Sequence, residues 1–211
     1  PSTDAPWCVS TIRSNSTYLI TGGLGDLGLK VAQWLITKGA SHLILVGRHQ
    51  PATHVQETIT QLTSLGTKIQ VIQADVSNAR DISQIIQNVK NLRGIIHAAG
   101  VLDDGIIENQ TWSRFEQVYL PKIQGAWNLH QFSQNHSLDF FVMFSSAASL
   151  LGSAGQANYT AANSFLDSLA FARRGLGLPA TSINWGRWDG MGKATKNAHL
   201  SQGISGMQAI A

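Results

Sequence analysis

The sequence contains a single cysteine, Cys8, among its 211 residues. No internal disulfide can form, so we expect a reducing, cytoplasmic setting. The seven histidines lack the H-E-x-x-H pattern and have no cysteine pairs near them, so the sequence predicts no metal site. No apolar run approaches the ~18 residues that a membrane helix requires, and the first residues do not resemble an export signal. These absences argue against a disulfide-rich, metal-centred or membrane-spanning protein.

Charged residues make up only 13% of the chain, and no block of five or six lysines and arginines occurs. So low a charged fraction argues against a disordered or coiled-coil chain. The formal net charge of +3 is small for this length, so we expect neither nucleic acid nor an anionic membrane as a partner. What the chain does have is a hydrophobic content of 43% with 20 glycines, which is typical of a globular α/β protein with one core.

Short apolar runs alternate with amphipathic ones from Tyr18 onward, and this rhythm indicates βαβ units. Strands so uniformly apolar need helices on both faces, so we expect a Rossmann-like, doubly wound parallel sheet of the α/β class. The predicted strands cover residues 18–21, 43–46, 69–72, 94–97, 140–144 and 180–184, and the predicted helices cover 26–38, 55–65, 81–89, 112–132 and 157–173.

The two ends of the chain differ from this pattern. Residues 1–17 are mostly polar and carry two prolines, which predicts a connector, and residues 18–188 form the predicted domain. Glycines interrupt the sequence after Trp185, so we expect residues 189–211 to form a flexible lid followed by the start of a helix. A disordered tail is the alternative reading of that segment.

A glycine-rich turn follows the first predicted strand and opens the first predicted helix. Glycine can take a positive φ there, and its missing side chain lets a pyrophosphate approach the N–H groups of the helix N-terminus. The pattern is weak alone, but its place in a βαβ unit predicts dinucleotide binding. The residues concerned are Thr21, Gly22, Gly23, Leu24, Gly25, Asp26, Leu27 and Gly28.

The end of the second strand distinguishes the two nicotinamide nucleotides, because the adenosine ribose lies there. Gly47 and Arg48 stand where an acidic residue would accept a bond from a free 2′-hydroxyl. A guanidinium suits a 2′-phosphate instead, so we expect NADPH (NADP⁺), although Arg48 could also be a solvated loop arginine.

Two further strand ends complete the predicted cofactor site. Asp75 and Val76 follow the third strand, where Asp75 could meet the adenine, while a helix N-cap at Asp75 or Ser77 fits the local pattern equally well. The fourth strand ends in small residues that would let the cofactor pack on the backbone, namely Ala98, Ala99 and Gly100. We expect His97, just before them, to be buried and satisfied, without a chemical role.

Four residues predict the chemistry of ketone reduction. Hydride attack on a carbonyl develops negative charge on oxygen, so the site must supply a proton and hold that oxygen. Tyr159 can supply the proton if a neighbouring cation lowers its pKa, and Lys122 is the candidate cation. Tyr159 lies 13 positions after Ser146, so the serine ends a strand and the tyrosine starts the next helix. Asn163, four residues on, shares that helical face and could orient Lys122 or a relay water.

At these residues the chain resembles the short-chain dehydrogenase/reductase superfamily and, more closely, the ketoreductase domains of modular polyketide synthases. The superfamily usually has Tyr-x-x-x-Lys, but here Asn163 takes the lysine position and Lys122 lies upstream, an exchange typical of synthase-embedded ketoreductases. The resemblance covers about residues 18–188. It implies a catalytic tetrad of Ser146, Tyr159, Lys122 and Asn163, and a β-ketoacyl thioester on an acyl carrier protein as substrate.

The resemblance also implies which configuration the product hydroxyl takes. Leu102, Asp103 and Asp104 match the Leu-Asp-Asp signature of B-type ketoreductases, which give a D-β-hydroxyl, and Gln156 belongs to the motif before the tyrosine. Asp103 and Asp104 could equally cap a helix. The A-type tryptophan is replaced by Leu151, Ala161 is not the proline of epimerising B-types, and Ala154 departs from a proline common in B-types.

Polyketide ketoreductases also carry a structural half that precedes the catalytic half, and only 17 residues precede Tyr18 here. We therefore expect that N-terminal half, other synthase domains and the acyl carrier protein as partners. Two alternatives stay open. A free-standing reductase of small ketones or alcohols would usually have lysine at position 163, and a non-catalytic cofactor-binding domain would be expected to have lost Tyr159 or Ser146.

Overall fold

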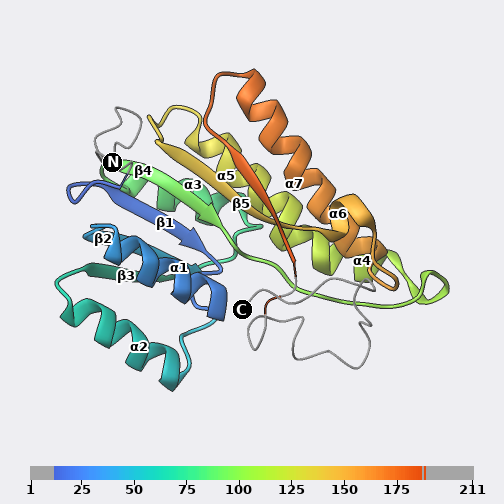
Figure 1. The fold of residues 1–211 in the computed structure, drawn as a ribbon, viewed down its shortest axis with the longest axis horizontal. Helices are drawn as coiled ribbons and strands as arrows, with labels where there is room; N and C mark the ends of the chain where they lie inside the picture. The colour runs from blue at the N-terminus through green and yellow to red at the C-terminus, as the bar shows by residue number, and fades with distance from the viewer. Residues whose placement is uncertain (1–11, 187, 189–211) are drawn as a thin grey trace, which may run out of the picture.

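A computed structural model describes residues 12–186 and 188. Within them, six parallel strands form one sheet in the order β3-β2-β1-β4-β5-β6 (Figure 1). This order confirms the predicted α/β, Rossmann-like architecture. The strands are β1 (Thr17–Thr21), β2 (His42–Gly47), β3 (Lys68–Gln73), β4 (Leu92–His97), β5 (Phe140–Ser146) and β6 (Thr181–Trp185). The predicted connector (1–17) and lid (189–211) lie largely or wholly outside the described residues.

The helices begin and end close to the predicted positions, with two additions. A short helix α6 follows β5, and a 3₁₀ turn, η1 (Ile107–Asn109), precedes α4; neither was predicted. The long helix expected over 112–132 is interrupted by a π-helical segment, η2 (Leu120–Gln124). The α-helices are α1 (Asp26–Thr37), α2 (Thr53–Ser64), α3 (Ala79–Asn88), α4 (Trp112–Tyr119), α5 (Gly125–Ser133), α6 (Ala148–Leu151) and α7 (Ala157–Gly175).

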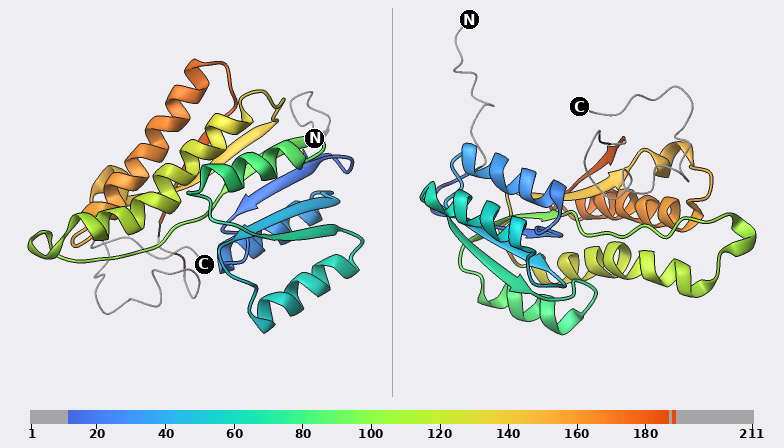
Figure 2. Two further views of the ribbon diagram at one scale, coloured as in Figure 1. Left: turned by 180° about the vertical axis from the view of Figure 1, so that it is seen from behind. Right: turned by 90° about the horizontal axis from the view of Figure 1, so that it is seen from below.

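Helices cover both faces of the sheet, as the apolar strands require (Figure 2). On one face, α3, α5 and α7 pack against side chains such as Leu19, Ile95 and Phe141. On the other, α1 and α2 pack against Tyr18, Ile20 and their neighbours on β2. Because alternate residues of each strand serve opposite faces, the two cores share the same strands and fix their register.

Arg173, on α7, is a buried charged side chain. Its guanidinium lies 3.9 Å from the ring centroid of Phe141 and donates from Nε to Pro179 O at 3.2 Å. Nη1 lies 2.9 Å from Nδ1 of His130. Burial lowers the pKa of Arg173 to about 10, yet the group stays charged at neutral pH because its donors have acceptors. This cluster fastens the C-terminal half of α7 to the sheet.

The N-cap of α3 is Asn78, not Asp75 or Ser77. The Asn78 side chain accepts from the backbone N–H groups of Arg80 and Asp81. Asp75 Oδ1 instead accepts from the N–H and the hydroxyl of Ser77, at 2.9 and 2.8 Å. The helix-cap alternative for Asp75 is therefore wrong, because its carboxylate closes the turn that leads into the helix.

From β1 the chain adds strands toward one edge of the sheet (β2, β3), and from β4 it adds strands toward the other edge (β5, β6), so the strand order reverses between β1 and β4. Ligands of doubly wound sheets bind at the carboxyl ends of the strands at such a reversal. Both the glycine-rich turn, after β1, and Ser146, at the end of β5, lie at this edge. The fold thus brings together the two groups of residues that the sequence singled out.

Candidate active site

Three elements bring the predicted catalytic residues to the carboxyl edge of the sheet. Ser146 ends β5, Lys122 lies in η2, and Tyr159 and Asn163 lie on the first turns of α7. Helix α7 packs against both β5 and η2. The spacing from Ser146 to Tyr159 therefore gives the geometry that the sequence predicted, with the serine at a strand end and the tyrosine on the following helix.

Lys122 is buried, with 5% of its surface exposed. Its Nζ donates to the carbonyl of Phe144 at 2.9 Å and lies 5.3 Å from the ring centroid of Tyr159. A methyl group added at Gly100 would lie 3.0 Å from Lys122 Cε, so a side chain at that position would crowd the lysine. The structure thus brings Lys122 beside Tyr159, although the two residues are 37 positions apart in the sequence.

The pKa of Tyr159 is raised, not lowered as expected from a neighbouring cation. Burial is the largest cause, because it disfavours the phenolate. Hydrogen bonding with the side chains of Ser146 and Asn163 acts in the opposite direction, and the charge of Asp104 adds to the rise. The phenol therefore carries its proton at neutral pH, which is the form that a proton donor requires.

The side chain of Asn163 makes no hydrogen bond to Lys122 among the described residues. Its Nδ2 donates to the carbonyl of Tyr159 at 2.8 Å, and its Oδ1 is buried without a hydrogen-bond partner among the described residues. Its own carbonyl accepts from Ser145 Oγ at 3.2 Å, which ties α7 to β5. Of the two roles expected for Asn163, orienting a relay water fits this arrangement better than orienting Lys122, because its Oδ1 is an acceptor that a water molecule could use.

The glycine-rich turn has the shape that a pyrophosphate needs. Gly22 has a φ of +69°, and a methyl group there would lie 2.7 Å from the backbone of Ala98. A methyl group on Gly28 would lie 2.3 Å from Gly22 O, so both glycines are required by close backbone packing. Gly25 differs, because a methyl group there meets only Gly22 O, at 3.4 Å. Gly25 is the N-cap of α1, and the first N–H groups of the helix have no side-chain cap among the described residues. These residues therefore fit a dinucleotide.

The remaining predicted cofactor residues lie along the same edge. Gly47 packs on Leu24 of the turn, since a methyl group there would lie 2.7 Å from Leu24 Cδ1. Arg48 is exposed, and its guanidinium has no carboxylate partner within residues 12–186 and 188. Val76 is buried, and the backbone N–H of Ala98 donates to Thr21 O at 3.0 Å. The structure brings these positions together, and their contacts with a nucleotide stay predictions.

The Leu-Asp-Asp segment is fastened to the helix that carries Tyr159. Arg114 of α4 forms a salt bridge with Asp103 at 2.5 Å, and Gln156 Nε2 donates to both carboxylate oxygens of Asp104, at 3.1 and 3.0 Å. Gly105 N donates to Gly155 O at 2.7 Å. Neither aspartate caps a helix of the described chain, so the capping alternative is wrong. Burial raises the pKa of Asp104, against the effect of Gln156.

His97 is buried and satisfied, as predicted. Its Nε2 lies 3.3 Å from the carbonyl of Lys122, and its Nδ1 lies 2.7 Å from the hydroxyl of Thr21. A carbonyl can only accept, so Nε2 carries the hydrogen and Nδ1 accepts from Thr21. Burial, followed by the charge of Lys122, lowers the pKa of His97 to about 3. The imidazole is therefore neutral, and it links the cofactor turn to the backbone of η2.

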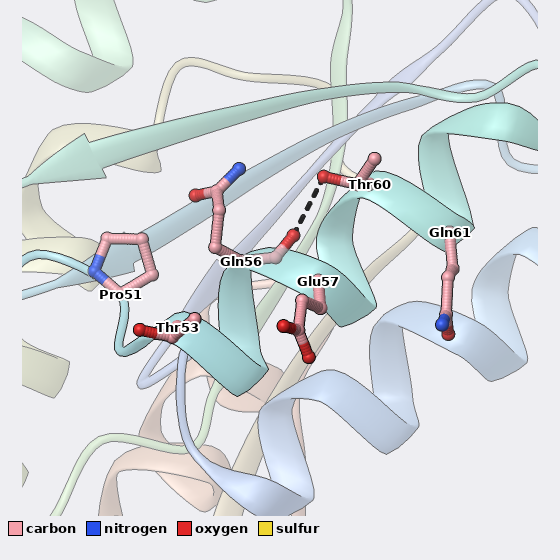
Figure 3. A pocket seen from close by; sticks show the side chains of 6 residues that line it. All are labelled: Pro51, Thr53, Gln56, Glu57, Thr60 and Gln61. Carbon is pink, nitrogen blue, oxygen red and sulfur yellow. Dashed lines mark hydrogen bonds between the residues drawn. The ribbon is translucent and has the colours of Figure 1, made fainter.

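A surface pocket lies apart from this site (Figure 3). It is formed by α2 and the loop before it, and it is lined by Pro51, Thr53, Gln56, Glu57, Thr60 and Gln61. None of these is a predicted site residue.

Within the part of the chain that the structure describes, no cluster of His, Cys, Asp or Glu could hold a metal ion. No described helix is both long and apolar enough to cross a membrane.

Comparison with protein families identifies the chain. The model of the KR domain family matches residues 16–190, which include the turn, the strand ends and all four predicted catalytic residues. The chain belongs to the KR domain family. KR domains are ketoreductases of the short-chain dehydrogenase/reductase superfamily, so this protein is an oxidoreductase, and domains of this family bind a nicotinamide cofactor.

The relatives that this KR domain matches are much larger proteins. It is 44% identical over 184 residues to the spectinabilin polyketide synthase system protein NorB of Streptomyces orinoci, covering 84% of this chain and 8% of the relative. It is 41% identical over 208 residues to the 6-methylsalicylic acid synthase of Aspergillus niger, covering 91% of this chain and 12% of the relative. The chain thus spans about a tenth of the length of the curated relatives that it matches.

Solved ketoreductases share the fold. A structure of A-type ketoreductases from a modular polyketide synthase superposes with a TM-score of 0.83 at 35% identity, covering 87% of this chain and 40% of that one.

Several residues that shape the site of this KR domain were not predicted from the sequence. These are Arg114, which anchors the Leu-Asp-Asp segment, and the polar residues around β5 and β6, Ser149, Asp167 and Asn184.

The buried His97 predicts a specific acid sensitivity. Its pKa is about 3 in the folded protein and about 6.5 in an unfolded chain, so between these values only the unfolded chain binds the proton. Stability from this group is therefore complete above pH 6.5 and is lost as the pH falls toward 3. We expect the free energy of unfolding to lose about 2 kcal/mol from His97 between pH 7 and pH 5. Urea unfolding of the native protein and His97→Gln at both pH values measures the difference, and an identical loss in both proteins would contradict the assignment.

Proposed function

We propose that this KR domain reduces a β-ketoacyl thioester carried on an acyl carrier protein to the D-β-hydroxyacyl thioester, with NADPH as the hydride source, during polyketide biosynthesis. The observation that carries the proposal is the meeting of Ser146, Lys122 and Tyr159 beside a glycine-rich turn that fits a dinucleotide. The similarity to a polyketide synthase system protein and to ketoreductases of modular polyketide synthases supports the substrate class.

The proton comes from Tyr159. When bound, the reduced nicotinamide supplies a hydride to the carbonyl carbon of the substrate. Burial keeps the Tyr159 phenol protonated until negative charge develops on the carbonyl oxygen, and the phenol then donates its hydrogen to that oxygen. Ser146 holds the same oxygen with its hydroxyl. The backbone N–H of Ala148 donates to Ser146 Oγ at 3.2 Å, which holds the serine oxygen in place while its own hydrogen, shared with Tyr159, turns to the substrate oxygen.

Lys122 stabilises the site after the proton has left. The tyrosinate that remains is a buried anion, and the ammonium 5.3 Å from its ring is the nearby charge that offsets its burial. Proton return to Tyr159 then runs past Asn163, whose buried Oδ1 has an acceptor position open beside the tyrosine.

Arg48 supports NADPH over NADH. It follows β2, and its exposed guanidinium has no carboxylate within residues 12–186 and 188 to neutralise it. A 2′-phosphate placed there would gain charge-assisted hydrogen bonds from the planar guanidinium.

Asp75 is the proposed contact of the adenine. It accepts two hydrogen bonds from Ser77, and these fix its carboxylate just after β3.

The Leu-Asp-Asp segment supports the D-configured product. Leu102, Asp103 and Asp104 lie on a segment that Arg114 and Gln156 fasten beside Tyr159. A fixed wall on one side of the carbonyl limits the direction from which the phosphopantetheine arm enters, and this selects the face that receives hydride.

The proposed partners are the N-terminal structural half, the acyl carrier protein and other synthase domains.

Turnover tests the proton donor. The intact protein should oxidise NADPH with a β-keto N-acetylcysteamine thioester, and Tyr159→Phe should lower kcat by at least about 100-fold because the proton source is lost. Tyr119→Phe removes a hydroxyl from the aromatic cluster on α4 and should leave kcat unchanged. Full turnover by Tyr159→Phe would refute the proposed mechanism, and a preference for a simple cyclic ketone over the thioester would refute the substrate class.

Cofactor choice tests Arg48. Arg48→Gln should raise the KM for NADPH roughly 10- to 100-fold, because charge-assisted bonds to the 2′-phosphate disappear, and should leave the KM for NADH unchanged. Lys38→Gln removes the same charge at the far end of α1 and serves as the control. Equal losses with the two cofactors would show that Arg48 does not read the phosphate.

Product configuration tests the stereochemical assignment. Reduction of a racemic 2-methyl-3-keto thioester, followed by chiral analysis, should give the D-β-hydroxyl with little selection at the α-carbon. Arg114→Gln should lower the excess of the D product, because the segment loses its salt bridge at Asp103. An L-configured product from the unaltered protein would overturn the B-type assignment and leave the reductase activity intact.

A further inference from the structure

A cluster of half-buried polar side chains lies behind the catalytic serine, on the side of β5 away from the glycine-rich turn. Asp167 of α7 stands at its centre. Its Oδ2 accepts from Ser149 Oγ at 2.6 Å and from Asn184 Nδ2 at 2.9 Å, and its Oδ1 accepts from Ser182 Oγ at 2.5 Å. The cluster therefore joins four elements, α6, α7, β5 and β6, at the end of the strand that carries Ser146.

The same donors also reach Ser146. Ser149 Oγ lies 2.8 Å from the carbonyl of Ser146, and Asn184 Nδ2 lies 3.3 Å from it. Asn184 Nδ2 also lies 2.8 Å from Ser149 Oγ. Ser149 has one hydroxyl hydrogen and the Asn184 amide has two, so these donors are shared between the Asp167 carboxylate and the Ser146 carbonyl. The position of the Ser146 backbone is thus coupled to the carboxylate.

Charge and hydrogen-bond type explain why the central residue is an aspartate. Three donors converge on its two oxygens, and a carboxylate can accept from all of them. An amide in its place would turn an N–H group toward one of these donors. Burial opposes ionisation of Asp167, but the hydrogen bonds from Ser149, Ser182 and Asn184 act against it and lower the pKa of Asp167. The acceptor is therefore ionised at neutral pH.

We infer that Asp167 is a positioning residue: through Ser149 and Asn184 it fixes the end of β5 so that the Ser146 hydroxyl points at the substrate carbonyl. The inference rests on the proposed function and deepens it, since it concerns the same reaction. Ser146 is the last residue of β5, and the next residue, Ala147, donates to Trp185 O at 2.9 Å. Pairing with β6 therefore holds the backbone just after Ser146, and the Asp167 cluster holds the Ser146 carbonyl itself.

A double-mutant cycle in the intact protein tests this coupling. Asp167→Asn should lower kcat roughly 10- to 100-fold, the loss expected when a catalytic group is misplaced. The KM for NADPH should stay unchanged, because the glycine-rich turn lies on the other side of β4. Combined with Ser146→Ala, Asp167→Asn should add less than about threefold, because a residue that acts through Ser146 has no effect once the hydroxyl is gone.

Asp139→Asn is the matched control. Asp139 is a largely buried carboxylate at the opposite end of β5, paired with Arg93, so its loss costs stability without reaching Ser146. If Asp167→Asn fails to fold, Ser149→Ala removes a single hydroxyl of the cluster and should show the same dependence on Ser146. Full kcat in the folded single variants, or losses that multiply with Ser146→Ala, would overturn the positioning role alone. Unchanged turnover in Ser146→Ala would overturn this role and the proposed mechanism together.

Discussion

The hydrogen bond from Lys122 Nζ to Phe144 O is the interaction on which the rest of the site depends. A buried ammonium is costly unless an acceptor replaces water, and the carbonyl near the end of β5 is that acceptor. The bond places the charge beside the ring of Tyr159, and its neighbour Gly100 leaves room for the lysine stem. The sheet edge, the glycine after β4 and the helix that faces them are therefore one structural unit.

The π-helical segment explains how a helix can deliver this lysine. Pro121 has no N–H and its ring would clash with the carbonyl four residues earlier in a regular α-helix. The wider π turn of η2 relieves that clash, and such turns are frequent at functional sites. Pro121 and Lys122 are both buried there. The proline therefore sets the local geometry, and the lysine one residue later reaches inward from a turn that differs from those of α4 and α5.

The sequence predicted the sheet well, because uniformly apolar strands and the helical spacing of their partners are local patterns. It also predicted that Ser146 and Tyr159 would meet, since they lie close in the chain. It did not predict η2, although Pro121 inside an expected helix was the signal. It could not predict the raised pKa of Tyr159, because that depends on burial by distant elements. The cluster at Asp167 likewise joins residues from four elements that only the tertiary structure brings together.

The two halves of the site are coupled through a neutral imidazole. His97 accepts from Thr21, at the start of the glycine-rich turn, and donates to the carbonyl of Lys122. A protonated His97 could no longer accept a hydrogen bond from Thr21. Burial disfavours the charged ring, and the positive charge of Lys122 repels it, so both lower the pKa of His97 and keep the imidazole neutral. A neutral polar ring at this position can bridge the turn and η2, whereas an apolar ring would leave the Thr21 hydroxyl buried without a partner. The placement of the cofactor turn and the placement of the lysine are therefore parts of the same buried hydrogen-bond chain.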